Sequence, residues 1–179
     1  MAGLEEREME YILYSKTGSF DAHYEQTAGI REFKPSFIRL RIKEEHCSWK
    51  VKLVRLRFCL EAKGNFRIFY YLSEDGKVVH TTYAIGKCVK FPYMEEGSIR
   101  LGPCKTEEAF RGRGIYPKIL THILKSKEFD GTTITMVVKE DNFSSIRGVE
   151  KAGFVPCGKV RKCKKTKKFY LVDDETKAV

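Results

Sequence analysis

Residues 98–124 read SIRLGPCKTEEAFRGRGIYPKILTHIL, and the rest of the chain is interpreted around them. Ile99 and Leu101 alternate with polar neighbours, which predicts a short strand over Ser98–Thr106. A turn that contains two glycines follows at residues 111–114. Beyond it, apolar residues recur at the spacing of one helical face: Ile115, Ile119, Leu120, Ile123 and Leu124. The stretch therefore predicts a strand, a glycine turn and an amphipathic helix, in that order.

The glycine turn has the composition of an anion-binding site. A helix entered through Gly112 and Gly114 presents unpaired backbone N–H groups at its positive end, and neither glycine has a Cβ to keep an anion away. Arg111 and Arg113 add positive charge, so the turn suits a pyrophosphate. Its spacing differs from a Walker A loop and from a Rossmann fingerprint. An ordinary strand-to-helix turn is the alternative for these residues alone.

Two motifs resemble those of a known superfamily. The turn FRGRGIY resembles the acetyl-CoA signature R/Q-x-x-G-x-G/A of the GNAT N-acetyltransferases: Arg111 and Gly114 match, whereas Tyr116 stands where a small residue is usual. Residues 142–154, NFSSIRGVEKAGF, resemble the N-x-x-[AS]…Y-E-K-x-G-F helix of the same superfamily, with Val149 in place of the tyrosine. Two motifs in this order are far more specific than either one alone.

The resemblance covers residues 66 to about 172, with a strand predicted over Thr132–Val138 between the motifs. It implies an α/β (α+β) fold of GNAT type: a mixed, mostly antiparallel central sheet that splays at the cofactor site and is flanked by helices. The length predicts one domain over residues 1–179, which the resemblance implies is GNAT-like. Its recognisable core is 66–172, and a variable N-terminal part, 1–65, shapes the substrate side.

Further strands are predicted outside the motifs. An Asp-Gly pair between the apolar runs Phe66–Leu72 and Lys77–Ala84 predicts a hairpin. A short strand is predicted at Tyr11–Ser15, and a last hairpin pairs Phe154–Lys159 with Lys168–Val172.

Two N-terminal segments stay ambiguous. Ile30–Cys47 fits a strand or a helix. Trp49–Leu60 alternates like a strand, yet Trp49, Leu53, Leu56 and Leu60 also form a helical stripe. A basic amphipathic helix on a membrane surface is one interpretation of the second segment. We favour packing of the stripe in the core, with solvated Lys and Arg side chains.

In GNAT-like enzymes, the strand before the phosphate turn splays from the next parallel strand, and its free backbone groups pair with pantetheine. The resemblance therefore implies acetyl-CoA as co-substrate, with Asn142 and Ser145 facing pantetheine from the far side. Capping of the following helix is the alternative role of Asn142. The implied cofactor-binding residues are Cys104, Lys105, Thr106, Arg111, Gly112, Arg113, Gly114, Ile115, Tyr116, Asn142 and Ser145.

Acetyl transfer to an amine needs a deprotonated amine, an oxyanion stabiliser and often a proton donor for the thiolate. The usual donor of the superfamily is the tyrosine that Val149 replaces, so another group donates or the thiolate leaves unassisted. We predict His80 as the general base, because an ordinary histidine pKa suits neutral pH. Tyr116 is the first candidate acid, and Glu107, with its neighbour Glu108, is a candidate proton relay.

Each catalytic assignment has a structural alternative. A lone histidine in a strand is more often structural than catalytic, and Glu107 and Glu108 lie next to arginines with which ion pairs are expected. Cys104 is a potential nucleophile, for which packing is the default.

Composition narrows the class of protein. The chain has 34 Lys+Arg against 24 Asp+Glu, a net charge of +10, which favours anionic ligands. Six cysteines without a C-x-x-C pair predict reduced thiols and no metal site. An acidic start and no apolar run of about 20 residues predict a cytoplasmic protein without signal peptide or transmembrane segment.

The resemblance thus implies an acetyl-CoA-dependent N-acetyltransferase that acts on a small amine. The turn, the Asn-x-x-Ser helix and the H-x-T strand together resemble those of GNAT members that modify amino sugars for surface polysaccharides, so an amino sugar is the expected acceptor. A CoA-binding module without transfer is the alternative, motivated by Val149. Nucleic-acid binding ranks third, motivated by the charge and by seven basic residues in Lys159–Lys168. The sequence leaves the oligomeric state open.

Overall fold

The structure, a computed structural model, describes residues 10–24 and 27–172. Its elements are β1 (Glu10–Thr17), β2 (Ile30–Phe33), α1 (Trp49–Glu61), β3 (Phe66–Leu72), β4 (Val78–Gly86), β5 (Ile99–Thr106), η1 (Glu108–Phe110), α2 (Ile115–Lys125), η2 (Lys127–Phe129), β6 (Thr133–Lys139), α3 (Phe143–Lys151), β7 (Val155–Lys162) and β8 (Phe169–Leu171).

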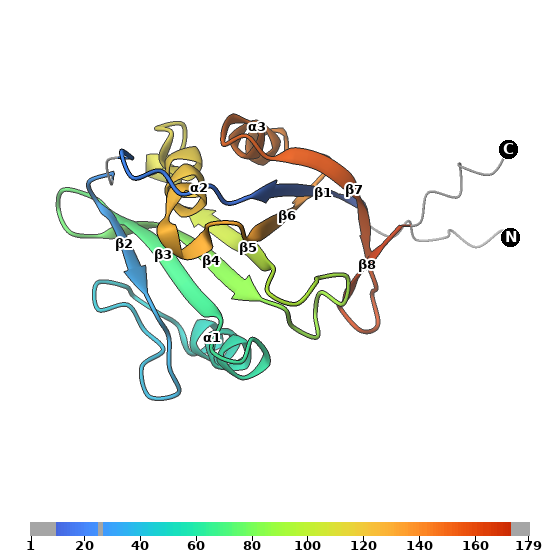
Figure 1. Ribbon diagram of the computed structural model, residues 1–179. Helices are drawn as coiled ribbons and strands as arrows, with labels where there is room; N and C mark the ends of the chain where they lie inside the picture. The colour runs from blue at the N-terminus through green and yellow to red at the C-terminus, as the bar shows by residue number, and fades with distance from the viewer. Residues whose placement is uncertain (1–9, 25–26, 173–179) are drawn as a thin grey trace, which may run out of the picture.

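The strands form one sheet in the order β2-β3-β4-β5-β6-β1-β7-β8. Neighbouring strands run antiparallel except β5 and β6, which are parallel. The first strand lies between β6 and β7, so the N-terminal segment completes the C-terminal half of the sheet (Figure 1). The predicted mixed, mostly antiparallel sheet is confirmed.

Helices cover the two faces of the sheet, with α2 and α3 on one and α1 on the other (Figure 1). The first face holds a core to which α2 contributes its complete apolar stripe. The stripe is Ile115, Ile119, Leu120, Ile123 and Leu124, as its spacing predicts. A second core includes Phe58 and Ala62 of the α1 region, with Phe66, Ile68 and Tyr83 of the sheet. The two cores hold the strands between them.

The N-terminal part differs most from the prediction. Residues 34–48 form neither strand nor helix, and Ile38 is 99% exposed while Ile42 is buried. Trp49–Glu61 is a helix, begun by Ser48, whose hydroxyl accepts a hydrogen bond from the Val51 N–H. The prediction that its apolar stripe packs in the core was wrong, because Trp49, Leu53 and Leu60 are exposed to solvent.

Arg55 explains this orientation. Its side chain is 1% exposed, and its guanidinium donates two hydrogen bonds, of 2.7 and 2.8 Å, to the Glu45 carboxylate. Its Nε donates to the Tyr83 hydroxyl at 2.9 Å. A buried guanidinium requires such partners, and they rotate α1 so that Arg55 and Phe58 face the sheet.

Candidate functional site

The sheet opens between β5 and β6. The two strands pair only over Ile99–Leu101, opposite Ile134–Met136. Further along, β5 keeps its pairing with β4, where Cys104 lies opposite Thr82 and Thr106 opposite His80. No described strand pairs with this part of β5 on its other side. Its backbone groups there form a free edge, at the position where the resemblance implies pairing with pantetheine.

Arg100, which is not among the site residues predicted from the sequence, lies where the strands separate. It is 8% exposed, its Nη1 donates to the Gly102 carbonyl at 2.9 Å, and its guanidinium carbon lies 4.0 Å from the centre of the Phe91 ring. Burial lowers its pKa. Among the described residues, no carboxylate lies within ion-pair distance of it. Arg100 thus holds the β5 backbone at the start of the opening. The one sequence signal for this role is a charged residue between the apolar residues Ile99 and Leu101 of the strand.

The glycine turn leads directly into α2. Gly114 is the N-cap residue with φ of +72°, and Gly112 has φ of +76°, in the region that favours glycine. A Cβ at either position would meet no atom within 4 Å, so the space in front of the turn is open. No side chain caps α2, so the N–H groups of Ile115 and Tyr116 at its positive end have no capping partner and are suited to an anion.

The two arginines of the turn take different positions. Arg111 Nε donates to the carbonyl of Thr106 at 3.4 Å, and Arg113 lies over the Phe110 ring at 4.8 Å. Arg111 therefore connects the turn to the end of the free edge of β5. Both side chains keep positive charge beside the start of α2.

Asn142 performs the capping role that was its alternative assignment. Its Oδ1 accepts hydrogen bonds from the Ser145 N–H at 3.2 Å and from the Ser144 hydroxyl at 3.0 Å. This cap starts α3. A pantetheine contact of Asn142 and Ser145 stays a prediction.

Tyr116 lies between α3 and the sheet. A Cβ on Gly148 would come within 2.6 Å of the Tyr116 ring, so the absence of a side chain in α3 leaves room for the phenol. The rings of Tyr116 and His80 are 5.8 Å apart, and the hydroxyl lies close enough to the Cys104 thiol to influence its pKa. Burial, followed by the nearby Cys104, raises the pKa of Tyr116. The phenol is therefore protonated at neutral pH and is available as a hydrogen-bond donor.

His80 occupies a different environment from the one a neutral-pH base requires. It is 1% exposed, and its Nδ1 and Nε2 lie 2.7 and 2.8 Å from the hydroxyl oxygens of Thr106 and Thr82. Burial lowers the pKa of His80 to about 4. The expectation of an ordinary histidine pKa was wrong, because the ring lies in the core under Tyr116. Proton transfer to His80 from outside would have to pass through one of the two threonine hydroxyls.

This buried histidine makes stability depend on pH. The unfolded chain has the ordinary histidine pKa of 6.5, whereas the pKa in the folded chain is about 4, so between these two pH values mainly the unfolded chain takes up this proton. Between pH 6.5 and 4 the free energy of unfolding should fall by about 3 kcal/mol on account of His80 alone. Urea titrations of the parent chain and of His80→Gln across this range measure the effect.

The variant should lose that part of the pH dependence. His46→Gln, which changes an exposed histidine, is the control and should retain the steep slope of the parent. Equal slopes for the parent and His80→Gln would show that His80 is not held neutral by burial.

Glu107 pairs with a lysine rather than with the neighbouring arginines. Its Oε1 accepts from Lys105 Nζ at 3.0 Å, and both side chains are exposed. Glu108 is also exposed and begins the short helix η1. An ion pair is therefore the observed role of Glu107, and its place in a proton relay stays a prediction.

A cavity of about 780 Å³ lies between α1 and the ends of β4 and β5. Val51 and Val54 of α1 line it together with Tyr83, Lys105 and Glu107. The loop before α1, held by Arg55, contributes another wall. The variable N-terminal part, 1–65, was expected to shape the substrate side, and its residues between Glu44 and Val54 do border the cavity. The cavity is therefore the candidate acceptor site.

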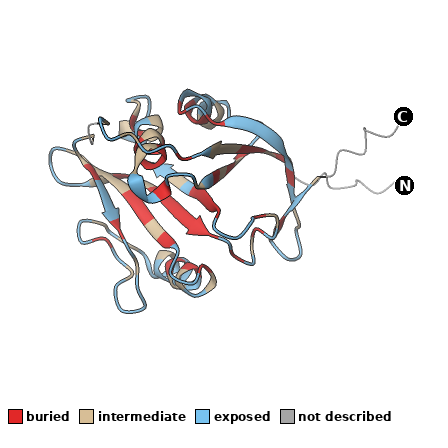
Figure 2. Ribbon diagram, viewed as in Figure 1, coloured by how far each residue is buried: buried red, intermediate tan, exposed pale blue. Residues whose placement is uncertain are grey.

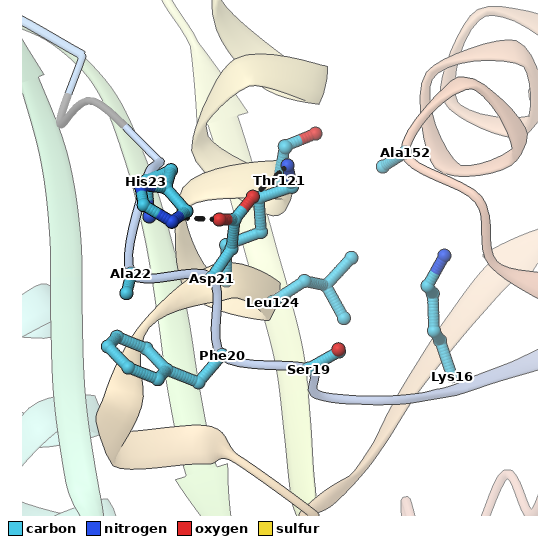
Figure 3. A pocket seen from close by; sticks show the side chains of 10 residues that line it. Lys16, Ser19, Phe20, Asp21, Ala22, His23, Thr121, Leu124 and Ala152 are labelled. Atoms are coloured by element: carbon cyan, nitrogen blue, oxygen red, sulfur yellow. Dashed lines mark hydrogen bonds and ion pairs between the residues drawn. The ribbon is translucent and has the colours of Figure 1, made fainter.

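Another cavity, of about 540 Å³, lies at the C-terminal end of α2, away from the glycine turn (Figure 3). Thr121 and Lys125 of α2 line it, with Lys16, Asp21 and His23 from the N-terminal segment. Asp21 accepts hydrogen bonds from Lys125 Nζ and from the His23 N–H. No residue predicted for the site lines this cavity, so we do not place the chemistry there.

Among residues 10–24 and 27–172, no group of three or more His, Cys, Asp or Glu side chains is arranged to hold a metal ion. In the same part of the chain, every helix is too short or too polar to cross a membrane.

No protein-family model and no curated protein sequence matches the chain. Solved structures do match it. A GNAT-family acetyltransferase from Colwellia psychrerythraea has a TM-score of 0.57 and 15% identity, over 86% of this chain and 54% of its own. A GCN5-related N-acetyltransferase from Sphaerobacter thermophilus has a TM-score of 0.52 and 12% identity, over 87% of this chain and 51% of its own.

N-myristoyltransferase from Saccharomyces cerevisiae, solved with bound myristoyl-CoA, has a TM-score of 0.50 and 13% identity, over 95% of this chain and 50% of its own. The chain thus spans about half the length of these three proteins. At such low identity the likeness concerns the fold. The chain has the GNAT fold, as its two motifs predicted.

Proposed function

We propose that the chain is an N-acyltransferase that moves an acetyl group from acetyl-CoA to an amine by direct attack in a ternary complex. The observation that carries this proposal is the free edge of β5 beside the uncapped amino end of α2. Backbone groups of the edge are suited to pair with pantetheine, and the helix end is suited to hold a pyrophosphate. The GNAT fold of the matched structures supports the same cofactor class.

The residues present fit such a cofactor. The open space in front of Gly112 and Gly114 admits a phosphate to the main chain, and Arg111 and Arg113 supply charge beside it. Acetyl-CoA supplies the acyl group when bound. We assign its contacts to the free edge, to the turn with the first residues of α2, and to the cap of α3, which together comprise all the cofactor-binding residues predicted from the sequence.

Two groups next to the free edge are available for proton handling. Thr106 connects the edge to the buried His80 ring through its hydroxyl. Tyr116 brings a protonated phenol to the same region, beside Cys104. We assign Tyr116 as the hydrogen-bond donor that stabilises the leaving thiolate, which takes its proton from solvent, because the raised pKa of Tyr116 makes the phenol a weak acid. We assign His80 as the group that holds Thr106 in place, because a pKa of about 4 makes His80 a weak base.

We assign the acceptor to the cavity of about 780 Å³. Glu107 offers a carboxylate there that attracts an ammonium group and relays its proton to solvent, so that the neutral amine can attack the thioester. Val51 and Val54 offer apolar surface to a sugar ring or a similar body. An amino sugar is our proposed acceptor class. Entry from the α1 face would bring the amine to the free edge from the side opposite Tyr116.

A CoA-binding module without transfer is the second candidate function. Val149 is completely buried and has no proton to give, and His80 is not titratable near neutral pH. The first observation removes the tyrosine that the superfamily pattern uses as proton donor. The second removes the general base predicted from the sequence.

Release of free thiol from acetyl-CoA distinguishes these functions. With a panel of amino sugars, amino acids and polyamines, the enzyme should release thiol in proportion to acetylated amine. Binding of CoA by calorimetry without release for any acceptor would favour the module. Absence of any CoA binding would exclude both.

A further inference from the structure

The helix α1 carries an apolar stripe that faces solvent. Trp49, Leu53 and Leu60 are 66%, 53% and 61% exposed. At 100° per residue they lie within about 40° of one another on the helix, and Leu56 falls on the same stripe. The opposite side of α1 is the one that contacts the sheet, through Arg55 and Phe58, so the helix has buried and exposed sides (Figure 2).

Single exposed apolar residues are ordinary on protein surfaces, but an aligned set of this size marks an interaction site more often. Burial of Arg55 with Glu45 fixes the rotation of α1, which shows that the exposure of the stripe is built into the packing. The stripe is therefore a permanent feature of this face of the protein.

Basic side chains flank the stripe. Lys52 lies on one side of it, and Lys50 and Arg57 lie on the other, each within about 80° of its centre. Arg57 is bonded to Glu61 at 2.6 Å, which leaves the two lysines as the net charge of the helix face. The chain as a whole carries a net charge of +10. A partner for this face must accept apolar side chains and carry negative charge.

A second copy of the chain fits this requirement poorly. A two-fold contact would place the stripe against itself and so bring Lys50 and Lys52 of one copy towards those of the other. An anionic lipid surface satisfies both parts of the requirement, because acyl chains receive the apolar side chains while the headgroups attract lysines. We propose that α1 docks the protein onto an anionic lipid surface through Trp49, Leu53, Leu56 and Leu60.

The position of α1 relates this surface to the candidate acceptor cavity. Ser48 and Val51, at the start of the helix, line the cavity of about 780 Å³. Docking through α1 would therefore place the lipid surface and the cavity on opposite sides of the same helix. The docking itself depends only on the exposed face of α1, and its test does not require the proposed transferase activity.

Trp49 makes a direct test available, because it is the single tryptophan of the chain. Vesicles of phosphatidylcholine mixed with phosphatidylglycerol should shift its emission to shorter wavelength and carry the protein down on sedimentation. Vesicles of phosphatidylcholine alone should do so much less, and salt should weaken the effect. Attachment through the basic residues of Lys159–Lys168 instead would sediment the protein without a shift in Trp49 emission, and would contradict docking through α1.

A matched pair of variants localises the contact. Leu53→Glu should weaken binding to the mixed vesicles at least about tenfold, because it removes an inserted apolar group and adds a repelled charge. Leu171→Glu makes the same change on β8 at nearly the same exposure, 51% against 53%, and should bind like the parent. Circular dichroism of both variants verifies the fold.

Three results would overturn the proposal. The first is an unchanged Trp49 emission with the mixed vesicles. The second is an equal loss of binding in the two leucine variants. The third is a shift in emission that grows with protein concentration without lipid, which would assign the stripe to a second copy of the chain.

Discussion

Replacement of Gly114 by valine is expected to abolish measurable CoA binding. Gly114 has φ of +72°, has open space beside its Cα, and is the N-cap residue of α2, whose first N–H groups have no side-chain cap. A β-branched side chain there would occupy the approach of the pyrophosphate. Loss of two hydrogen bonds to a charged phosphate, each worth about 1.5–3 kcal/mol, lowers the affinity by more than about 100-fold. Calorimetric titration of CoA into the parent and the variant measures this effect.

The substitution also strains the backbone, so it needs a control with the same strain. Gly76 has φ of +76° in the turn between β3 and β4, and a Cβ there would also meet no atom within 4 Å. Gly76→Val should lose a similar amount of stability, on the order of 1–3 kcal/mol, and keep the parent affinity for CoA. If Gly114→Val is folded and binds CoA like the parent, the cofactor does not lie at this turn.

The region around Gly114 was predictable because its signals are local. The alternation in β5, the glycines and the apolar stripe of α2 all lie within 27 residues of sequence and agree with one another. The observed bounds, Ile99–Thr106 and Ile115–Lys125, follow the expected ones closely. The Asn142 cap and the hairpin with Asp75-Gly76 were predictable for the same reason.

The orientation of α1 was not predictable, because it depends on partners distant in sequence. A helical pattern places Arg55 in solvent by default, yet Arg55 is buried because Glu45 and Tyr83 satisfy it. The pKa of His80 has a similar origin. It depends on burial of the ring, and the residues that lie against the ring include Thr106 and Tyr116, 26 and 36 positions away in the sequence.

The exchange of Tyr116 and Val149 relative to the GNAT pattern yields the last prediction. Val149 is 0% exposed in the core that α2 and α3 share. Next to it in sequence, Gly148 lies under the Tyr116 ring, so α2 supplies the aromatic group that the pattern expects from α3. The space around Val149 is therefore already filled, and a second aromatic ring has no room.

Val149→Tyr should accordingly be harmful rather than restore a proton donor. Overpacking a filled core costs about 1–3 kcal/mol, which corresponds to about 5- to 150-fold in turnover if the strain acts against the transition state. The free energy of unfolding should fall by a similar amount, and this second measurement does not depend on activity. Val155→Tyr, at a position 61% exposed, is the control and should change neither quantity appreciably.

The combination with Tyr116→Gly tests the physical reason. If the two side chains compete for one space, the double variant should be more stable than the sum of the single effects predicts, since removal of the Tyr116 ring makes room for the phenol introduced in α3. Glycine near the start of α2 costs about 1 kcal/mol by itself, so the single variant Tyr116→Gly must be measured as well. A single Val149→Tyr variant that turns over faster than the parent would contradict this account, because it would show that α3 had lost a donor for which the site still has room.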